Sequence, residues 1–403
     1  MGLCLARKES PYSLDHMLGL QYFTTDTSGI GGRLRCCIED FVVEELPRTF
    51  PACDGGDYVH FTLEKRNWET IAAVRRIARS LGVSSRRFGY AGNKDKRALT
   101  RQRVGVWHVK PDRLMNVKIR GIRLSDPVAS DSRLGLGDLE GNRFQIVVRD
   151  PSLPTERLDE TLHETREQIN ASGLPNYYGY QRFGTMRPNT HLVGKKLVQG
   201  DVEGAVMSYL GNPCTTEKED AKHARQYLEQ TRDYRGALKL YPRRLGYERA
   251  MLDPLASNSS DYVGAMRKLP KKLGRLLVQA YQSYLFNRIL SAIIEAGLNT
   301  MNSFLPLIGF RTEIDNSPQC EIAKSILDRE GVTTRDFHVR AIPELSSEGA
   351  IRKASVKARP NFTVQMENRE GPARIVTFEF SLPPGSYATA ILREFMKADP
   401  SAY

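Results

Sequence analysis

The chain has 403 residues and a mass of 45.5 kDa, a length that favours two or three domains with ample core. Hydrophobic residues make up 40% and charged residues 26%, as in soluble globular proteins, and no apolar run approaches the roughly 18 residues of a membrane span. Basic residues exceed acidic ones by 59 − 47 = 12. A basic surface of this size predicts a polyanionic partner, most often a nucleic acid.

Cysteine and histidine usage argues against a metal site. The six cysteines form no Cys-x-x-Cys pair and the seven histidines are scattered, so neither zinc ligation nor a disulfide framework is expected. The N-terminus lacks the apolar core of a secretory signal and supports no lipid anchor. The glycines at 135, 137 and 141 lead into a strand rather than a helix, which argues against a nucleotide-binding loop. We therefore expect a cytoplasmic protein without a metal or nucleotide cofactor.

The first hundred residues read as alternating strands and one helix. Residues 1–30 are expected to be a partly ordered lead-in, and a β-rich run follows at Phe41–Val43. After a Gly-rich break at residues 53–57, apolar and polar residues alternate over Tyr58–Leu63, as in a half-buried strand. A helix with one apolar face is expected to start at an Asn67 cap and to end at Gly82.

The next stretch, Phe88–Thr100, contains a short apolar run, a polar turn with Asp95 between Lys94 and Lys96, and a new alternating run from Leu99. We interpret it as strand, exposed turn, strand, with one acid held among basic groups. The alternative is an ordinary β-hairpin whose Gly, Asn and Asp only make the turn.

The rest of the chain changes texture twice. A strand and a helix are predicted first, the region up to about residue 345 is mostly helical, and the end returns to two strands and a terminal helix; the predicted elements are Asn142–Arg149, 155–171, 217–230, 271–296, 361–366, 373–380 and 387–396. Strand-rich ends that flank a helical middle suggest one α+β domain interrupted by an inserted domain.

An aromatic stretch at Pro175–Gly184 precedes several basic residues: Arg182, Arg187, Lys195 and Lys196. Such a combination could stack on bases and contact phosphates. A packed domain junction explains the same residues equally well, and the sequence does not decide between the two.

Six stretches carry further information because they occur together and in a fixed order: Glu39–Glu44, Gly89–Thr100, Gly141–Phe144, Pro175–Gly184, Gln282–Asn287 and Leu382–Thr389. They resemble the motifs of the TruD family of tRNA pseudouridine synthases. The departures are Ile38 where the family often has Pro, Arg35 where many members have Lys, and Tyr178 in place of Phe.

The resemblance implies an α+β fold: a pseudouridine synthase catalytic domain with a mixed, largely antiparallel sheet and flanking helices, interrupted by an inserted, mostly helical TRUD domain. The expected division is residues 1–173 and 348–403 for the catalytic domain and residues 174–347 for the insert. RNA would bind in a basic cleft between the two.

The resemblance also implies a nucleophilic Asp, which maps onto Asp95, and an active-site Asn and Phe, which map onto Asn142 and Phe144. The reaction cuts the N–C glycosidic bond of a uridine, turns the base and rejoins it through carbon, so no cofactor is expected. Arg35, Lys94 and Lys96 are candidates for the cation that keeps the carboxylate charged. Phe144 could stack on the flipped uracil, and Asn142 could hydrogen-bond Asp95 or the substrate.

The expected function is therefore isomerisation of a uridine, at position 13 of tRNA as the resemblance implies, by a protein for which a monomer is favoured. Whether Asp95 attacks the sugar or the base stays open. Two other classes remain: a non-catalytic RNA-binding or chaperone protein of the same fold, and an acid-dependent phosphodiesterase, which would need a carboxylate cluster that the sequence does not display.

Overall fold

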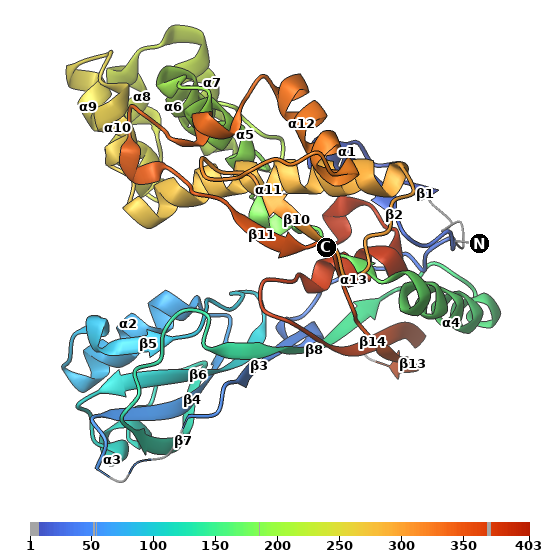
Figure 1. Ribbon diagram of the computed structural model, residues 1–403. Helices are drawn as coiled ribbons and strands as arrows, with labels where there is room; N and C mark the ends of the chain where they lie inside the picture. The colour runs from blue at the N-terminus through green and yellow to red at the C-terminus, as the bar shows by residue number, and fades with distance from the viewer. Residues whose placement is uncertain (1–7, 51–52, 54, 185, 369–371) are drawn as a thin grey trace. The chain divides into compact units, whose positions relative to one another are not determined.

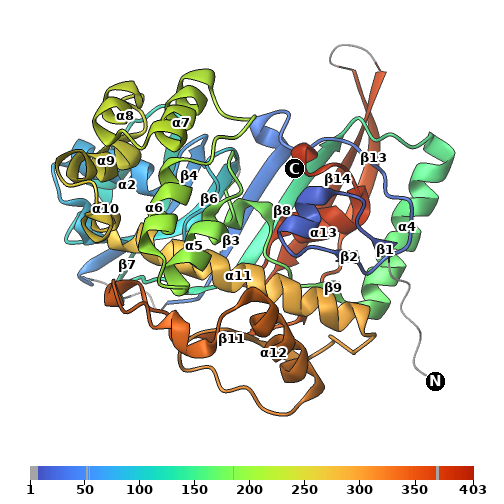
Figure 2. The ribbon, with the colours of Figure 1, turned by 90° about the horizontal axis from the view of Figure 1, so that it is seen from above.

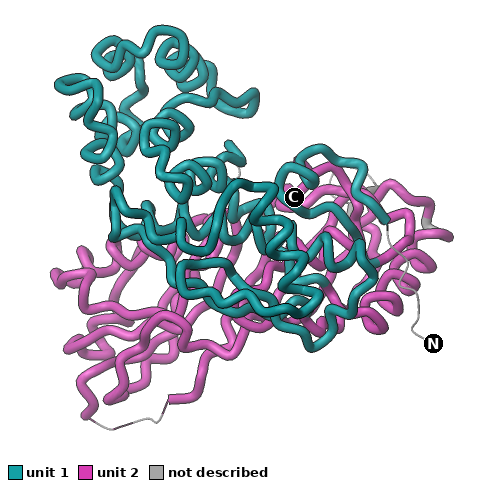
Figure 3. The backbone as a smooth tube through the Cα atoms, turned by 45° about the horizontal axis from the view of Figure 1, so that its top comes forward, with its two compact units in different colours: residues 1–24, 175–355 teal, residues 25–174, 356–403 magenta. Residues whose placement is uncertain are grey.

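The computed structural model describes residues 8–50, 53, 55–184, 186–368 and 372–403. The chain divides into two compact units, drawn in different colours in Figure 3. Unit 1 comprises residues 1–24 and 175–355, and unit 2 comprises residues 25–174 and 356–403. These units are defined by backbone proximity, and the domain assignment made from the sequence stays a prediction.

Unit 2 is built on one eight-stranded sheet (Figure 1). Its strands are β3 (Phe41–Pro47), β4 (Tyr58–Arg66), β5 (Phe88–Tyr90), β6 (Leu99–Trp107), β7 (Ile122–Ser130), β8 (Leu139–Arg149), β13 (Asn361–Asn368) and β14 (Pro372–Leu382). The order is β13-β14-β8-β3-β6-β4-β7, with β5 paired to β6. The β3–β6 pair is parallel and the other pairs are antiparallel, so the predicted mixed, largely antiparallel sheet is confirmed.

Helices cover one face of this sheet in two places. Helix α2 (Thr70–Leu81) packs on β4 and β6 through Val74 and Ile77. Helices α4 (Thr155–Ser172) and α13 (Ala388–Met396) contribute to the apolar cluster of β3, β8 and β14. Figures 1 and 2 both show α4 toward the β13 end of the sheet and α2 toward the other end. We call the face that these helices cover the inner face.

The register of the strands places specific residues together on the inner face. Val43 of β3 lies opposite Phe144 of β8, and the next inward position pairs Glu45 with Asn142. On the other side of β3, Thr100 of β6 lies beside Val43 and opposite Lys65 of β4. Polar residues on this otherwise apolar face therefore gather where β3, β4, β6 and β8 come together.

Unit 1 is mostly helical, as predicted. Its helices are α1 (Ser13–Met17), α5 (Thr190–Val198), α6 (Val202–Leu210), α7 (Glu219–Thr231), α8 (Tyr234–Leu240), α9 (Gly246–Ser257), α10 (Tyr262–Arg267), α11 (Lys271–Glu295) and α12 (Pro318–Glu330). Short antiparallel pairs join β1 (Lys8–Glu9) to β2 (Tyr22–Phe23) and β10 (Phe304–Leu307) to β11 (Ala350–Lys353). Helix α11 is buried along most of its length, and its buried polar side chains have hydrogen-bond partners: Gln282, Ser283, Asn287 and Ser291.

The structure sharpens two sequence expectations and overturns a third, the Asn67 cap. The lead-in contains β1, α1 and β2 from residue 8 onward, while residues 1–7 lie outside the described part, as does residue 54 of the Gly-rich break. The N-cap of α2 is Glu69, whose side chain makes no capping hydrogen bond. Asn67 lies two residues earlier in a left-handed backbone conformation with φ 60° and does not cap the helix.

The other sharpened expectation concerns the stretch around Asp95, where the expected order of strand, exposed turn and strand is confirmed by β5 and β6. Strand β5 pairs with the far end of β6, Tyr90 opposite Val104, so residues 91–98 form a loop and not a tight hairpin turn. The near end of β6 pairs instead with β3 and β4. Tertiary pairing overrides the local turn signal here.

Among the described helices, none combines the length and low charge that crossing a bilayer requires.

Candidate active site

Asp95 lies on the loop between β5 and β6 and carries an accessible carboxylate. Its side chain is 45% exposed, and its Oδ2 lies 2.9 Å from Nη2 of Arg35, which is only 13% exposed. The guanidinium donates a charge-assisted hydrogen bond to the carboxylate. One oxygen thus has a fixed cationic partner while much of the group remains open to solvent.

Arg35 is itself held on two sides. Its guanidinium carbon lies 4.1 Å from the centre of the Phe41 ring, a cation–π arrangement, and its backbone is left-handed at φ 57°. The segment between these residues is fixed by Asp40, which accepts hydrogen bonds of 2.7–3.0 Å from the guanidinium of Arg149. Asp40 and Phe41 of the Glu39–Glu44 motif therefore serve to aim Arg35.

Lys94 does not point at Asp95. Its Nζ lies 2.6 Å from Oε2 of Glu45, and the two side chains are 6% and 0% exposed. The other oxygen of Glu45 accepts the backbone N–H of Arg103 at 3.1 Å, just beyond the point where the β3–β6 ladder ends. The ammonium of Lys94 therefore anchors the loop to the sheet through a buried ion pair.

Three further buried polar side chains hold the backbone of the loop. Lys65 donates to the carbonyls of Lys94 and Asp95 at 3.2 and 2.8 Å. Thr70, at the start of α2, accepts the N–H of Lys94 at 3.0 Å. Gln102 donates to the carbonyl of Gly92 at 3.0 Å.

The sequence analysis did not single out Glu45, Lys65, Thr70 or Gln102. For Lys65 a signal existed: the inward positions of β4 run Val59, Phe61, Leu63 and then Lys65. A lysine that continues an apolar alternation is a marker of a buried charge, because Lys is rarely buried without a partner.

Asn142 and Phe144 occupy the inner face of β8, two strands away from the base of the loop. Phe144 is 7% exposed, with its ring stacked on Phe380 at 5.4 Å and edge-on to Phe41 at 6.4 Å. Within the described residues, Oδ1 of Asn142 is buried and receives no hydrogen bond. The structure therefore packs Phe144 mainly into the core and leaves Asn142 with an unused acceptor on the same face as Glu45.

The aromatic and basic stretch of unit 1 is engaged within the protein. Tyr177 and Tyr178 are buried, and the amide of Asn287 on α11 bonds both the N–H and the carbonyl of Tyr178 at 2.8 and 3.1 Å. Arg182 donates to Ser283 at 3.0 Å. These contacts lie within unit 1 and favour packed side chains over a base-stacking platform.

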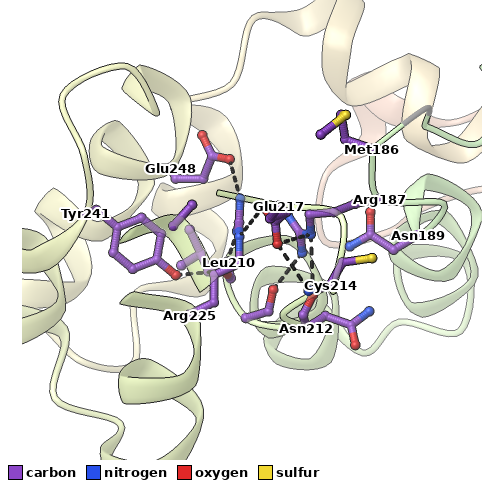
Figure 4. Close-up of polar contacts among 12 residues, drawn as sticks. Met186, Arg187, Asn189, Leu210, Asn212, Cys214, Glu217, Arg225, Tyr241 and Glu248 are labelled. Atoms are coloured by element: carbon purple, nitrogen blue, oxygen red, sulfur yellow. Dashed lines mark hydrogen bonds and ion pairs between the residues drawn. The ribbon is translucent and has the colours of Figure 1, made fainter. Parts of the chain in front are cut away.

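The basic residues that follow also have internal partners. Lys195 pairs with Glu330 at 2.7 Å and Lys196 with Asp201 at 3.0 Å. Arg187 donates to the carbonyl of Gly211 at 2.6 Å and lies 3.4 Å from Glu217 (Figure 4). Burial lowers the pKa of Arg187.

A hollow of about 440 Å³ opens on the opposite face of the unit 2 sheet. Its lining includes Arg101, Glu64 and Arg123 but not Asp95. Arg101 and Glu64 pair with each other at 2.8 Å, so the charges of the hollow partly neutralise one another, and we do not place the reaction there.

The residues around Asp95 combine an accessible acid, a fixed cation and a buried supporting network. No group of three or more potential ligands for a metal ion occurs in the described part of the chain. Such an arrangement can hold a carboxylate in one orientation toward a substrate.

Comparison with known proteins shows which family the chain resembles. Residues 17–304 and 299–395 match the family model described as tRNA pseudouridine synthase D (TruD). A probable tRNA pseudouridine synthase D of Methanosarcina acetivorans is 38% identical over 96% of this chain and 97% of its own, and that of Methanopyrus kandleri is 42% identical over 88% and 89%.

A solved structure agrees with these relatives. The crystal structure of the putative tRNA pseudouridine synthase D from Methanosarcina mazei superposes with a TM-score of 0.81 at 36% identity, over 96% of this chain and 98% of that one. The fold expected from the resemblance is thereby confirmed, and the chain belongs to the TruD family of pseudouridine synthases.

Proposed function

We propose that this protein converts a uridine of tRNA, at position 13, to pseudouridine, with Asp95 as the nucleophile. The observation that carries the proposal is the half-exposed carboxylate of Asp95, held 2.9 Å from Arg35 on an otherwise anchored loop. Family membership supplies the reaction class. The buried polar side chains around the loop hold the backbone from which this carboxylate projects.

The residues around Asp95 have distinct tasks in this proposal. Arg35 keeps a positive charge beside the carboxylate and, being planar, also fixes its orientation. Asn142 offers an unused buried acceptor that can receive a hydrogen bond from the uracil. Phe144 packs mainly into the core, and in this proposal the small exposed part of its side chain contacts the base. Lys94 acts on the loop through Glu45 and does not touch the substrate.

The reaction is an isomerisation and needs no external reactant. The N1–C1′ bond of the uridine breaks, a C5–C1′ bond forms, the proton on C5 leaves and N1 gains one. The base must first leave the stack, at a cost of a few kcal/mol. The net charge of +12 supplies attraction for the phosphates of tRNA. We further propose a cytoplasmic monomer with the domain division given by the sequence.

The test compares wild-type protein, Asp95→Asn and Asp112→Asn on a tRNA transcript, with pseudouridine detected by carbodiimide treatment and primer extension. Asp112 is an exposed acid of the same unit, in the first turn of α3 (Pro111–Met115), and serves as the matched control. We expect Asp95→Asn to lose at least about a thousandfold in rate and the control to keep wild-type activity.

Two outcomes would count against the proposal in different ways. Full activity of Asp95→Asn would remove Asp95 as the nucleophile. A wild-type protein that binds tRNA but forms no product would favour the non-catalytic RNA-binding alternative. A transcript with cytidine at position 13 must stay unmodified, and modification elsewhere would correct the position.

A further inference from the structure

Lys65 is the most deeply buried charged group near the Asp95 loop. Its relative exposure is 0%, and its Nζ donates to three backbone carbonyls: Trp68 at 2.7 Å, Asp95 at 2.8 Å and Lys94 at 3.2 Å. No described carboxylate lies within 4.0 Å of its ammonium. Its direct hydrogen-bond partners are thus backbone carbonyls, while the carboxylates of Asp95 and Glu69 act on the charge from a greater distance.

Burying an ammonium group costs free energy, so the presence of a lysine at this position needs an explanation. Burial lowers the pKa of Lys65 to about 8, because the charged form loses hydration. An apolar residue would continue the inward alternation of Val59, Phe61 and Leu63 without that cost. What a lysine adds here is three donors on one atom.

The two loop carbonyls flank the α-carbon of Asp95. The carbonyl of Lys94 belongs to the peptide plane before this carbon, and the carbonyl of Asp95 belongs to the plane after it. One ammonium that holds both planes restricts the backbone angles of Asp95 and therefore the direction of its Cα–Cβ bond. The carboxylate projects from a backbone whose orientation is set by Lys65.

The third hydrogen bond connects the loop to a rigid element. Trp68 precedes α2, and Thr70 in the first turn of that helix accepts the N–H of Lys94. Lys65 and Thr70 thus attach the loop to the start of α2 through the two peptide groups on either side of the Lys94 α-carbon.

We propose that Lys65 is a positioning residue that orients the nucleophilic carboxylate of Asp95 by clamping the two peptide groups on either side of it. This inference rests on the proposed function. A purely structural lysine would stabilise the fold without changing the rate of the chemical step, and the two roles therefore predict different kinetics.

The experiment measures single-turnover rate, tRNA affinity and melting temperature for Lys65→Met, Lys65→Arg and the control Lys118→Met, an exposed lysine of the same unit. We expect Lys65→Met to lower the single-turnover rate roughly 10- to 100-fold, the range that charge-assisted hydrogen bonds support, with unchanged tRNA affinity. Lys65→Arg restores part of that loss, because the guanidinium keeps the charge and several donors.

A folded Lys65→Met protein with the wild-type rate would overturn the inference. If the methionine variant does not fold, Lys65→Gln decides, because glutamine removes the charge and reduces the number of donors: a lowered rate at unchanged affinity supports the clamp, and a wild-type rate refutes it. A wild-type protein that makes no pseudouridine would instead refute the proposed function.

Discussion

Two buried basic clusters of this protein use charge in opposite ways. In unit 1, Arg225 is 1% exposed and forms ion pairs of 3.0 Å with Glu217 and 2.9 Å with Glu248 (Figure 4). It also donates to the carbonyls of Tyr209 and Leu210 at the end of α6. In unit 2, Lys65 is equally buried and has carbonyl partners only.

The difference is in what each cluster leaves exposed. The two carboxylates paired with Arg225 are largely covered: Glu217 and Glu248 are 8% and 12% exposed. The charged groups of this cluster therefore neutralise one another inside the protein. The network around Lys65 ends at Asp95, whose side chain stays 45% exposed. A buried charge network that terminates in an accessible acid indicates a functional site, whereas a closed one indicates stability.

The largest expected effect is on stability and belongs to the closed cluster. Arg225→Met leaves two buried carboxylates without their shared partner, and we expect a loss of about 3–5 kcal/mol in the free energy of unfolding. Melting of the full chain measures it. Arg232→Met is the matched control, because its pair with Glu203 is half exposed and should contribute less than about 1 kcal/mol.

The single-turnover rate of the folded Arg225→Met fraction should equal that of the wild type. A rate loss without a stability loss would reverse the roles that the comparison assigns to the two clusters.

The second prediction concerns the buried pair at the base of the active loop. Glu45→Gln keeps the size of the side chain but removes the charge 2.6 Å from Lys94. We expect the single-turnover rate to fall about 10- to 100-fold, because Lys94 loses its anchor and the loop shifts. Hydrogen exchange of the amides of residues 92–96 should rise in parallel, and a rate loss without faster exchange would argue for a direct role of Glu45.

Part of this site could be read from the sequence, and the remainder could not for physical reasons. Asp95 stood out through its motif, and Lys65 could have been found from the alternation of β4. The pairing of Glu45 with Asn142 depends on the register between β3 and β8, which no local pattern encodes. The alternative of a tight hairpin turn at residues 92–96 fails for a similar reason, since β5 pairs with the far end of β6 and the near end of β6 pairs with β3 and β4.

Arg35→Lys tests the geometry of the cation beside Asp95. The charge remains, but the planar fork and its position over the Phe41 ring are lost. Such cation–π contacts contribute about 0.5–2 kcal/mol, so we expect a rate about 3- to 30-fold lower with unchanged tRNA affinity. Arg33→Lys, an exposed neighbour paired with Asp150, should leave the rate unchanged, and an equal loss in both variants would mean that the loss is not specific to the cation beside Asp95.

The smallest expected effect is a pH dependence of the wild-type rate. The charged groups acting on Lys65 are Asp95 and Lys94 of the loop and Glu69 before α2, and burial lowers its pKa to about 8. Because the pKa of Lys65 in the folded protein lies below its ordinary value, its side chain carries three N–H donors below about pH 8 and loses one of them above that pH. We expect the single-turnover rate to fall about 2- to 10-fold through this pKa, the contribution of one hydrogen bond, and the limb to disappear in Lys65→Arg. An identical limb in that variant would assign the titration to another group, since the guanidinium stays charged throughout.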